Sequence, residues 1–154
     1  MVIMNLVSIQ TFRQEATTRT ITLQDEDPET VKRMLSFIYD GDYDQGDSAG
    51  EEQIARNNIK LYVTADKFNI DSLKEVAKDR FIKWYKNYLG DKFKEITREA
   101  LEAAPPHDDG IFDAVLDFLE RRMVEERERL MDDELVDVLE DCGALKEMFN
   151  RMVT

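Results

Sequence analysis

Hydrophobic and polar residues alternate along residues 19–23, where Ile21 and Leu23 alternate with Thr20 and Thr22. A period of two is typical of a β-strand with one buried face. This segment is the one strand that the sequence predicts. The acidic residues that follow it lead into a pattern with a longer period.

A first helix is predicted to begin at Pro28, directly after Asp27. An aspartate there can accept a hydrogen bond from the free amides of the first turn, and proline has no amide to leave unpaired. We expect the helix to dock on the strand and to end at Gly41, which can adopt a left-handed backbone. Its apolar residues recur at spacings of three and four and form one face: Val31, Met34, Leu35, Ile38 and Tyr39.

The next helix is predicted to form the centre of the core, and a third helix follows it. The helix from about residue 54 to residue 68 is apolar on more than one side, as expected of an element buried between neighbours. Asp71 is the expected cap of the following helix. That helix carries an aromatic stripe, which we expect to pack in the core rather than bind a ligand: Phe81, Trp84, Tyr85 and Tyr88.

The second half of the chain is predicted to be helical throughout. Gly90, Pro105-Pro106 and Gly143 interrupt the helical pattern and separate its helices. We expect residues 89–154 to form a helical layer that packs on the helix ending near Tyr88. The charge-rich segment 121–130 is expected to be a solvated helix face rather than a partner-binding amphipathic helix.

The overall charge limits the partners. The formal net charge is −13, which argues against nucleic acid and against anionic membrane surfaces, because both require clustered Lys and Arg. The apolar segment 1–10 is interrupted by Asn5 and Ser8 well short of a membrane span, and it lacks the features of a signal peptide. We therefore expect a cytoplasmic or nuclear protein.

The residue inventory argues against catalysis. Cys142 and His107 are each the only residue of their type, so the sequence offers no disulfide framework, no zinc ligand set and no nucleophile–base pair. We predict that the protein is not an enzyme and needs no cofactor.

An acidic segment after the first helix matches the spacing of a calcium-binding loop. The residues at the first, third, fifth and twelfth places are Asp40, Asp42, Asp44 and Glu51. However, Gln45 stands where such loops need glycine, and Asp47 stands where they usually carry an apolar residue. A calcium-binding helix-loop-helix protein that uses the 40–51 loop is therefore the alternative, and a solvated loop between helices is the favoured interpretation.

Residues 18–44 and 59–81 together resemble the second half of the BTB/POZ domain, in the form abundant in fungi. The motifs that carry the resemblance are Asp27-Pro28 at the turn from strand to helix, the aromatic segment from Tyr39 to Tyr43, and Ala65-Asp66-Lys67-Phe68 on a later helix. The resemblance implies a mainly α (α+β) protein: the C-terminal part of a BTB/POZ fold with one strand, followed by a helical extension.

One departure from the family pattern shapes the predicted domain organisation. Intact members carry an Asp near their first strand and a His-Lys pair after the second, and this chain shows neither. We therefore expect a partial BTB/POZ domain over residues 12–88, an unassigned apolar segment over residues 1–11 and a C-terminal helical extension over residues 89–154.

The resemblance also implies a function. BTB/POZ domains typically associate with themselves and recruit protein partners, and some are adaptors for cullin-type ubiquitin ligases. We accordingly expect a protein–protein interaction module whose partners include itself or a cullin-type scaffold. The sequence does not assign the interaction surface to particular residues.

Overall fold

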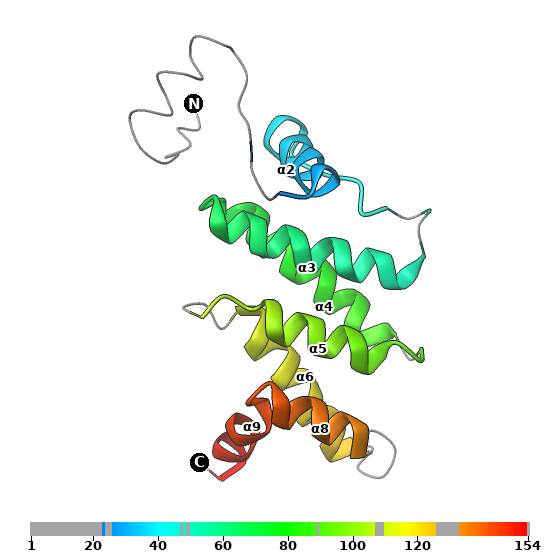
Figure 1. The fold of residues 1–154 in the computed structure, drawn as a ribbon, viewed down its shortest axis with the longest axis vertical. Helices are drawn as coiled ribbons and strands as arrows, with labels where there is room; N and C mark the ends of the chain where they lie inside the picture. Colours follow the sequence, from blue (N-terminus) through cyan, green and yellow to red (C-terminus); the bar gives the residue numbers. More distant parts are fainter. Residues whose placement is uncertain are drawn as a thin grey trace.

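The computed structural model of the chain describes residues 23, 26–46, 48, 50–88, 90–106, 110–125 and 133–153. Its elements are seven α-helices in these ranges (Figure 1). In chain order they are α2 (Pro28–Asp40), α3 (Glu51–Lys67), α4 (Asp71–Asn87), α5 (Phe93–Ala103), α6 (Gly110–Glu125), α8 (Asp133–Asp141) and α9 (Ala144–Val153).

The predicted mainly helical character is confirmed, but the predicted BTB/POZ fold with one strand is wrong for the described part of the chain. No strand occurs within the ranges given above. Of the predicted strand 19–23, only Leu23 is described, and it belongs to no helix or strand. A strand is stable only when a neighbouring strand pairs with its amides and carbonyls, and the described residues provide no such neighbour.

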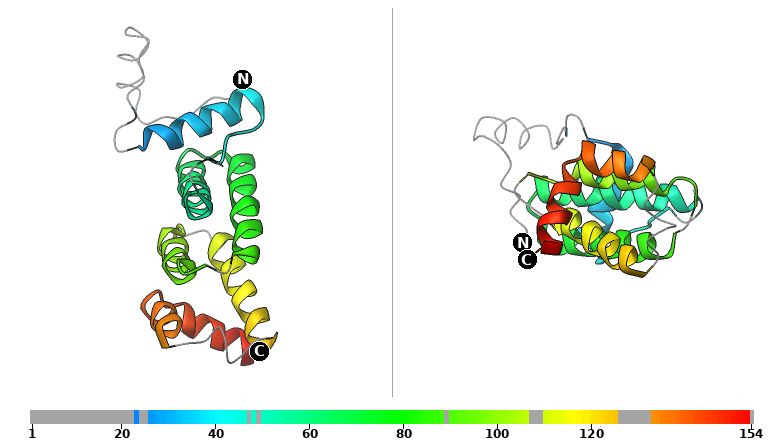
Figure 2. Two further views of the ribbon diagram at one scale, coloured as in Figure 1. Left: turned by 90° about the vertical axis from the view of Figure 1, so that its right-hand side faces the viewer. Right: turned by 90° about the horizontal axis from the view of Figure 1, so that it is seen from below.

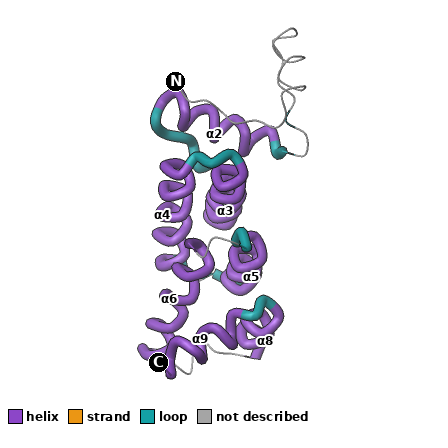
Figure 3. Tube along the Cα trace, turned by 90° about the vertical axis from the view of Figure 1, so that its left-hand side faces the viewer, coloured by secondary structure: helices purple, strands orange, loops and turns teal. Residues whose placement is uncertain are grey.

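The helices form an elongated stack. Figure 2 shows α3, α5 and α8 lying one above another across the long axis, while α4 and α6 follow each other along it. Helix α2 packs on α3 at one end of the stack, and α8 and α9 pack together at the other end (Figure 3). No helix among the described residues combines the length and the apolarity that a membrane crossing requires.

Both predicted ends of α2 are confirmed. The Asp27 carboxylate accepts hydrogen bonds from Thr30 N at 3.0 Å and from Thr30 Oγ1 at 2.7 Å. These two bonds stabilise the charged carboxylate and lower the pKa of Asp27. At the other end Gly41 has a φ of 77°, and its amide donates to Phe37 O at 2.9 Å.

The predicted apolar face of α2 is only partly buried. Met34 is fully buried, but Leu35 is 41% exposed and Tyr39 is 82% exposed. Of the described helices, α2 packs closely on α3 alone. One neighbouring helix covers a narrow stripe of the surface of α2, so the outer edge of the predicted apolar face stays open.

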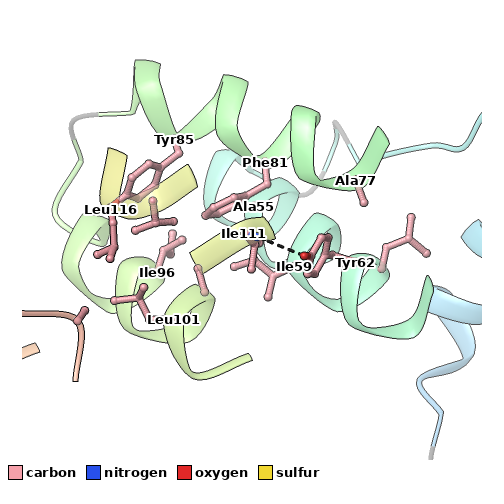
Figure 4. Packing of buried hydrophobic residues seen from close by; sticks show 14 of the residues in the cluster. Ala55, Ile59, Tyr62, Ala77, Phe81, Tyr85, Ile96, Leu101, Ile111 and Leu116 are labelled. Carbon is pink, nitrogen blue, oxygen red and sulfur yellow. Dashed lines mark hydrogen bonds between the residues drawn. The ribbon is translucent and has the colours of Figure 1, made fainter. Parts of the chain in front are cut away.

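The predicted central position of α3 is confirmed, since it contacts α2, α4 and α5. Its buried Tyr62 hydroxyl accepts a hydrogen bond from Ile111 N at 3.2 Å (Figure 4). On α4, Phe81 and Tyr85 are fully buried, as the stripe predicts. Asp71 does not cap α4: it is the first helical residue, and no side chain caps this end.

The core continues into the second half of the chain. Helix α5 ends at Ala103, before the two prolines, as predicted. Ile96 and Leu101 of α5 lie beside Ile111 and Leu116 of α6 (Figure 4). Helix α6 packs on α4, as expected of the helical layer, whereas α5 packs on α3. Residues 126–130 of the charge-rich segment lie outside the described residues.

Candidate interaction site at the acidic loop

The acidic segment between α2 and α3 is anchored by Tyr43. This side chain is buried, and its ring meets Phe37 of α2 edge-on with 6.3 Å between the ring centroids. Its hydroxyl donates to Asn58 Oδ1 of α3 at 2.7 Å. Burial raises the pKa of Tyr43 to about 12.

Arg80 of α4 holds the same part of the loop from the other side. Its Nη1 donates to Tyr43 O at 3.1 Å, and its Nη2 donates to Asp42 Oδ1. The guanidinium also lies over the Tyr43 ring, 4.2 Å from the centroid, which is a cation–π geometry. The hydrogen bond from Arg80, followed by one from the Tyr43 amide, lowers the pKa of Asp42.

Two neighbouring amide side chains of α3 bind the end of the loop. Asn57 Nδ2 donates to Gln45 O at 2.8 Å, and Asn58 Nδ2 donates to Gln45 Oε1 at 3.2 Å. Helix α2 contributes Arg33, whose Nε donates to Asp44 O at 2.9 Å. Three helices therefore hold residues 42–46, while the Asp42 and Asp44 side chains remain exposed to solvent.

The four residues of the calcium alternative do not converge on one point. Asp40 ends α2 and Glu51 begins α3, and Asp42 is paired with Arg80. The Asp44 carboxylate accepts from Gly46 N at 2.8 Å. Within the described ranges, no three His, Cys, Asp or Glu side chains are grouped to hold a metal ion. Asp47 lies outside the described residues.

The two single residues considered for catalysis are far apart in the sequence. His107 lies outside the described residues. Cys142 is half-buried, and burial raises the pKa of its thiol.

A cleft of about 500 Å³ opens beside the anchored loop. One wall is aromatic: the rings of Trp84 and Tyr88 are stacked with 4.4 Å between centroids. The Tyr88 hydroxyl donates to Glu52 Oε1 at 2.7 Å, which lowers the pKa of Glu52, while burial and this bond raise the pKa of Tyr88. The lining residues are Gln45, Glu51, Arg80, Lys83, Trp84, Asn87 and Tyr88.

Gly90 is what allows this aromatic wall to form. A β-carbon at residue 90 would overlap the ring and the hydroxyl of Tyr88. The absence of a side chain therefore lets the Tyr88 ring fold back against the chain and reach both Trp84 and Glu52. The sequence pattern uses Gly90 only as a helix break and does not predict the cleft.

Exposed large hydrophobic side chains mark both ends of the stack. Among the described residues they occur on α2, as Leu35 and Tyr39, and on α9, where Phe149 is 59% exposed and Val153 is 87% exposed. These two helices lie at opposite ends of the long axis (Figure 3).

The described part of the chain is a helical stack with an anchored loop, a cleft and exposed apolar positions at both ends, and these are features of a protein-interaction module. The comparison with protein families agrees with this class. The family model of the BTB/POZ domain matches residues 3–84, which is more than half of the 154-residue chain. The chain belongs to the BTB/POZ domain family, a family of protein-interaction domains. Neither the curated proteins nor the solved structures gave a significant match.

Proposed function

We propose that the chain is a non-catalytic adaptor that binds one protein at each end of its helical stack. The observation that carries this proposal is the location of the exposed large hydrophobic side chains, which within the described residues lie on α2 and α9 alone. An adaptor needs two separate binding surfaces, and these helices are the two ends of an elongated molecule.

Each end offers a pair of apolar residues on one helix face. Leu35 and Tyr39 are four residues apart, and so are Phe149 and Val153. Residues with this spacing are neighbours on a helix surface. Single exposed apolar residues are common on proteins, but a pair on one face provides the anchors with which a helix binds a groove or another helix.

The two ends are proposed to bind different kinds of partner. Helix α2 lies within the residues that match the BTB/POZ family, and α9 lies outside them. We assign the family's type of partner, a cullin-type ubiquitin ligase scaffold or a second copy of the chain, to the α2 end. The α9 end would then bind the protein that the adaptor brings to the scaffold.

Matched variants at the two ends test this assignment. We expect Tyr39→Ala to weaken binding of the chain to a purified cullin amino-terminal domain, measured by calorimetry, and Phe149→Ala to leave that binding unchanged. Both positions are exposed, so each variant should keep its free energy of unfolding within about 0.5 kcal/mol of the unsubstituted chain.

Sedimentation of the same proteins measures self-association. A dimer that Tyr39→Ala dissociates would place the second copy, instead of the scaffold, at the α2 end. The adaptor proposal is wrong if the unsubstituted chain binds no scaffold and stays a monomer, or if Tyr39→Ala and Phe149→Ala have equal effects.

A further inference from the structure

Trp84, which lines the cleft beside the acidic loop, carries a hydrogen-bond donor that lacks an acceptor. Trp84 Nε1 is buried and has no partner among the residues that the structure describes. The buried tyrosine hydroxyls all have partners: Tyr43 with Asn58, Tyr62 with Ile111, Tyr85 with Thr97 and Tyr88 with Glu52. Because a buried donor without an acceptor is destabilising, native structures rarely keep one without a reason.

The cleft also contains a cation that is free to bind a ligand. Arg80 is committed to Asp42 and to the Tyr43 carbonyl. Lys83 lines the cleft, is an exposed residue and forms no ion pair with a described residue. Glu51 is the one carboxylate of the lining. In a chain with a net charge of −13, a free cation beside an aromatic wall is a distinctive combination.

We propose that this cleft binds an extended peptide segment in which an acidic residue stands next to an apolar one. The Trp84–Tyr88 wall would receive the apolar side chain, and Lys83 would pair with the carboxylate. Glu51 disfavours a second carboxylate, so the cleft selects a single acidic residue over an acidic run. The volume of about 500 Å³ is of the size that ligand sites in proteins have.

Trp84 contributes apolar surface to the cleft, and its ring is held in place by the stacked ring of Tyr88. Its Nε1 is covered in the free chain, and the Tyr88 ring stacks on the indole. Polyphosphate ligands and nucleic acid fit this site less well, because they require several uncompensated cations and Lys83 is a single one.

The test uses the full chain and the indole N–H signal of Trp84, its single tryptophan. The probe is the acetylated and amidated peptide Gly-Leu-Glu-Leu-Gly, and the same peptide with Gln in place of Glu is its neutral partner. We expect the Glu peptide to shift the indole signal, because binding against the Trp84–Tyr88 wall changes the surroundings of the indole. It should bind about threefold more tightly than the Gln peptide, because the carboxylate would pair with an exposed lysine and such pairs contribute up to about 1 kcal/mol.

Two lysine variants separate the cleft from the helix surface around it. Lys83→Gln should abolish the preference for Glu over Gln, because the ammonium group that pairs with the carboxylate is then absent. Lys86→Gln is the matched control, because Lys86 is an exposed lysine of the same helix that does not line the cleft. This variant should keep the full preference.

Three results would overturn the proposal. These are an indole signal that does not move at millimolar peptide, an unchanged preference in Lys83→Gln, and a stronger response to ATP than to the Glu peptide. The proposal is independent of the adaptor assignment, because the end variants Tyr39→Ala and Phe149→Ala should leave the peptide response unchanged. Loss of the response in either of them would mean that the peptide binds at an end of the stack and not in the cleft.

Discussion

Removal of the Tyr43 hydroxyl tests whether the acidic loop is anchored as the structure shows. In Tyr43→Phe the ring can keep its contacts with Phe37 and with the Arg80 guanidinium, and only the hydrogen bond to Asn58 is lost. The substitution thus isolates one buried interaction between the loop and α3.

The expected cost follows from what remains around Asn58. This side chain is fully buried, and its Nδ2 still donates to Ile54 O at 2.9 Å and to Gln45 Oε1 at 3.2 Å. These bonds hold Asn58 in place, so its Oδ1 is left buried without a donor. Such a loss costs about 1–3 kcal/mol. For a chain of this size, a loss of about 2 kcal/mol lowers the melting temperature by roughly 4–8 °C.

The measurement is chemical and thermal unfolding of Tyr43→Phe beside Tyr39→Phe. Tyr39 is an exposed tyrosine four residues earlier, so its variant should differ from the unsubstituted chain by no more than about 0.5 kcal/mol. The double variant Asn58→Ala/Tyr43→Phe should lose less free energy of unfolding than the sum of the losses in Asn58→Ala and in Tyr43→Phe. The difference should be at least about 0.5 kcal/mol, because the two side chains share one hydrogen bond. Equal stability of Tyr43→Phe and Tyr39→Phe would refute the anchored loop.

Two further predictions follow from the same region. Burial raises the pKa of Tyr43 from its usual 10.0 to about 12, so the folded chain keeps a proton that the unfolded chain loses. The stabilising contribution of Tyr43 should therefore be complete below pH 10 and disappear as the pH rises towards 12. The free energy of unfolding measured against pH tests this. If Tyr43→Phe does not reduce the slope of that free energy between pH 10 and pH 12, the prediction is wrong. Gly90→Ala should displace the Tyr88 ring and break its hydrogen bond to Glu52, which destabilises the chain by about 1 kcal/mol. The displaced ring should also change the fluorescence emission of Trp84. Unchanged emission would show that the position of the ring does not depend on Gly90.

Local features of the sequence predicted the helices well. The Asp27 cap and the left-handed Gly41 depend on residues within one turn of the helix end, and both are present. The period of apolar residues likewise predicted that α3 is buried on several sides. The exposure of Tyr39 was not predictable in this way, because it depends on how many neighbours pack on α2, and that number is a property of the whole fold.

The interaction site depended on contacts between distant residues. The calcium alternative rested on the order of carboxylates along one segment, but the partner of Asp42 is Arg80, 38 residues away. A cation at Asp42 would have to compete with that guanidinium, which also holds the Tyr43 carbonyl and covers the Tyr43 ring. One signal in the sequence pointed towards the loop contact: Asn57 and Asn58 are adjacent amides in a helix predicted to be buried. Buried amides need hydrogen-bond partners, and here the loop provides them, so polar residues within a predicted core helix indicate which helix receives a neighbouring loop.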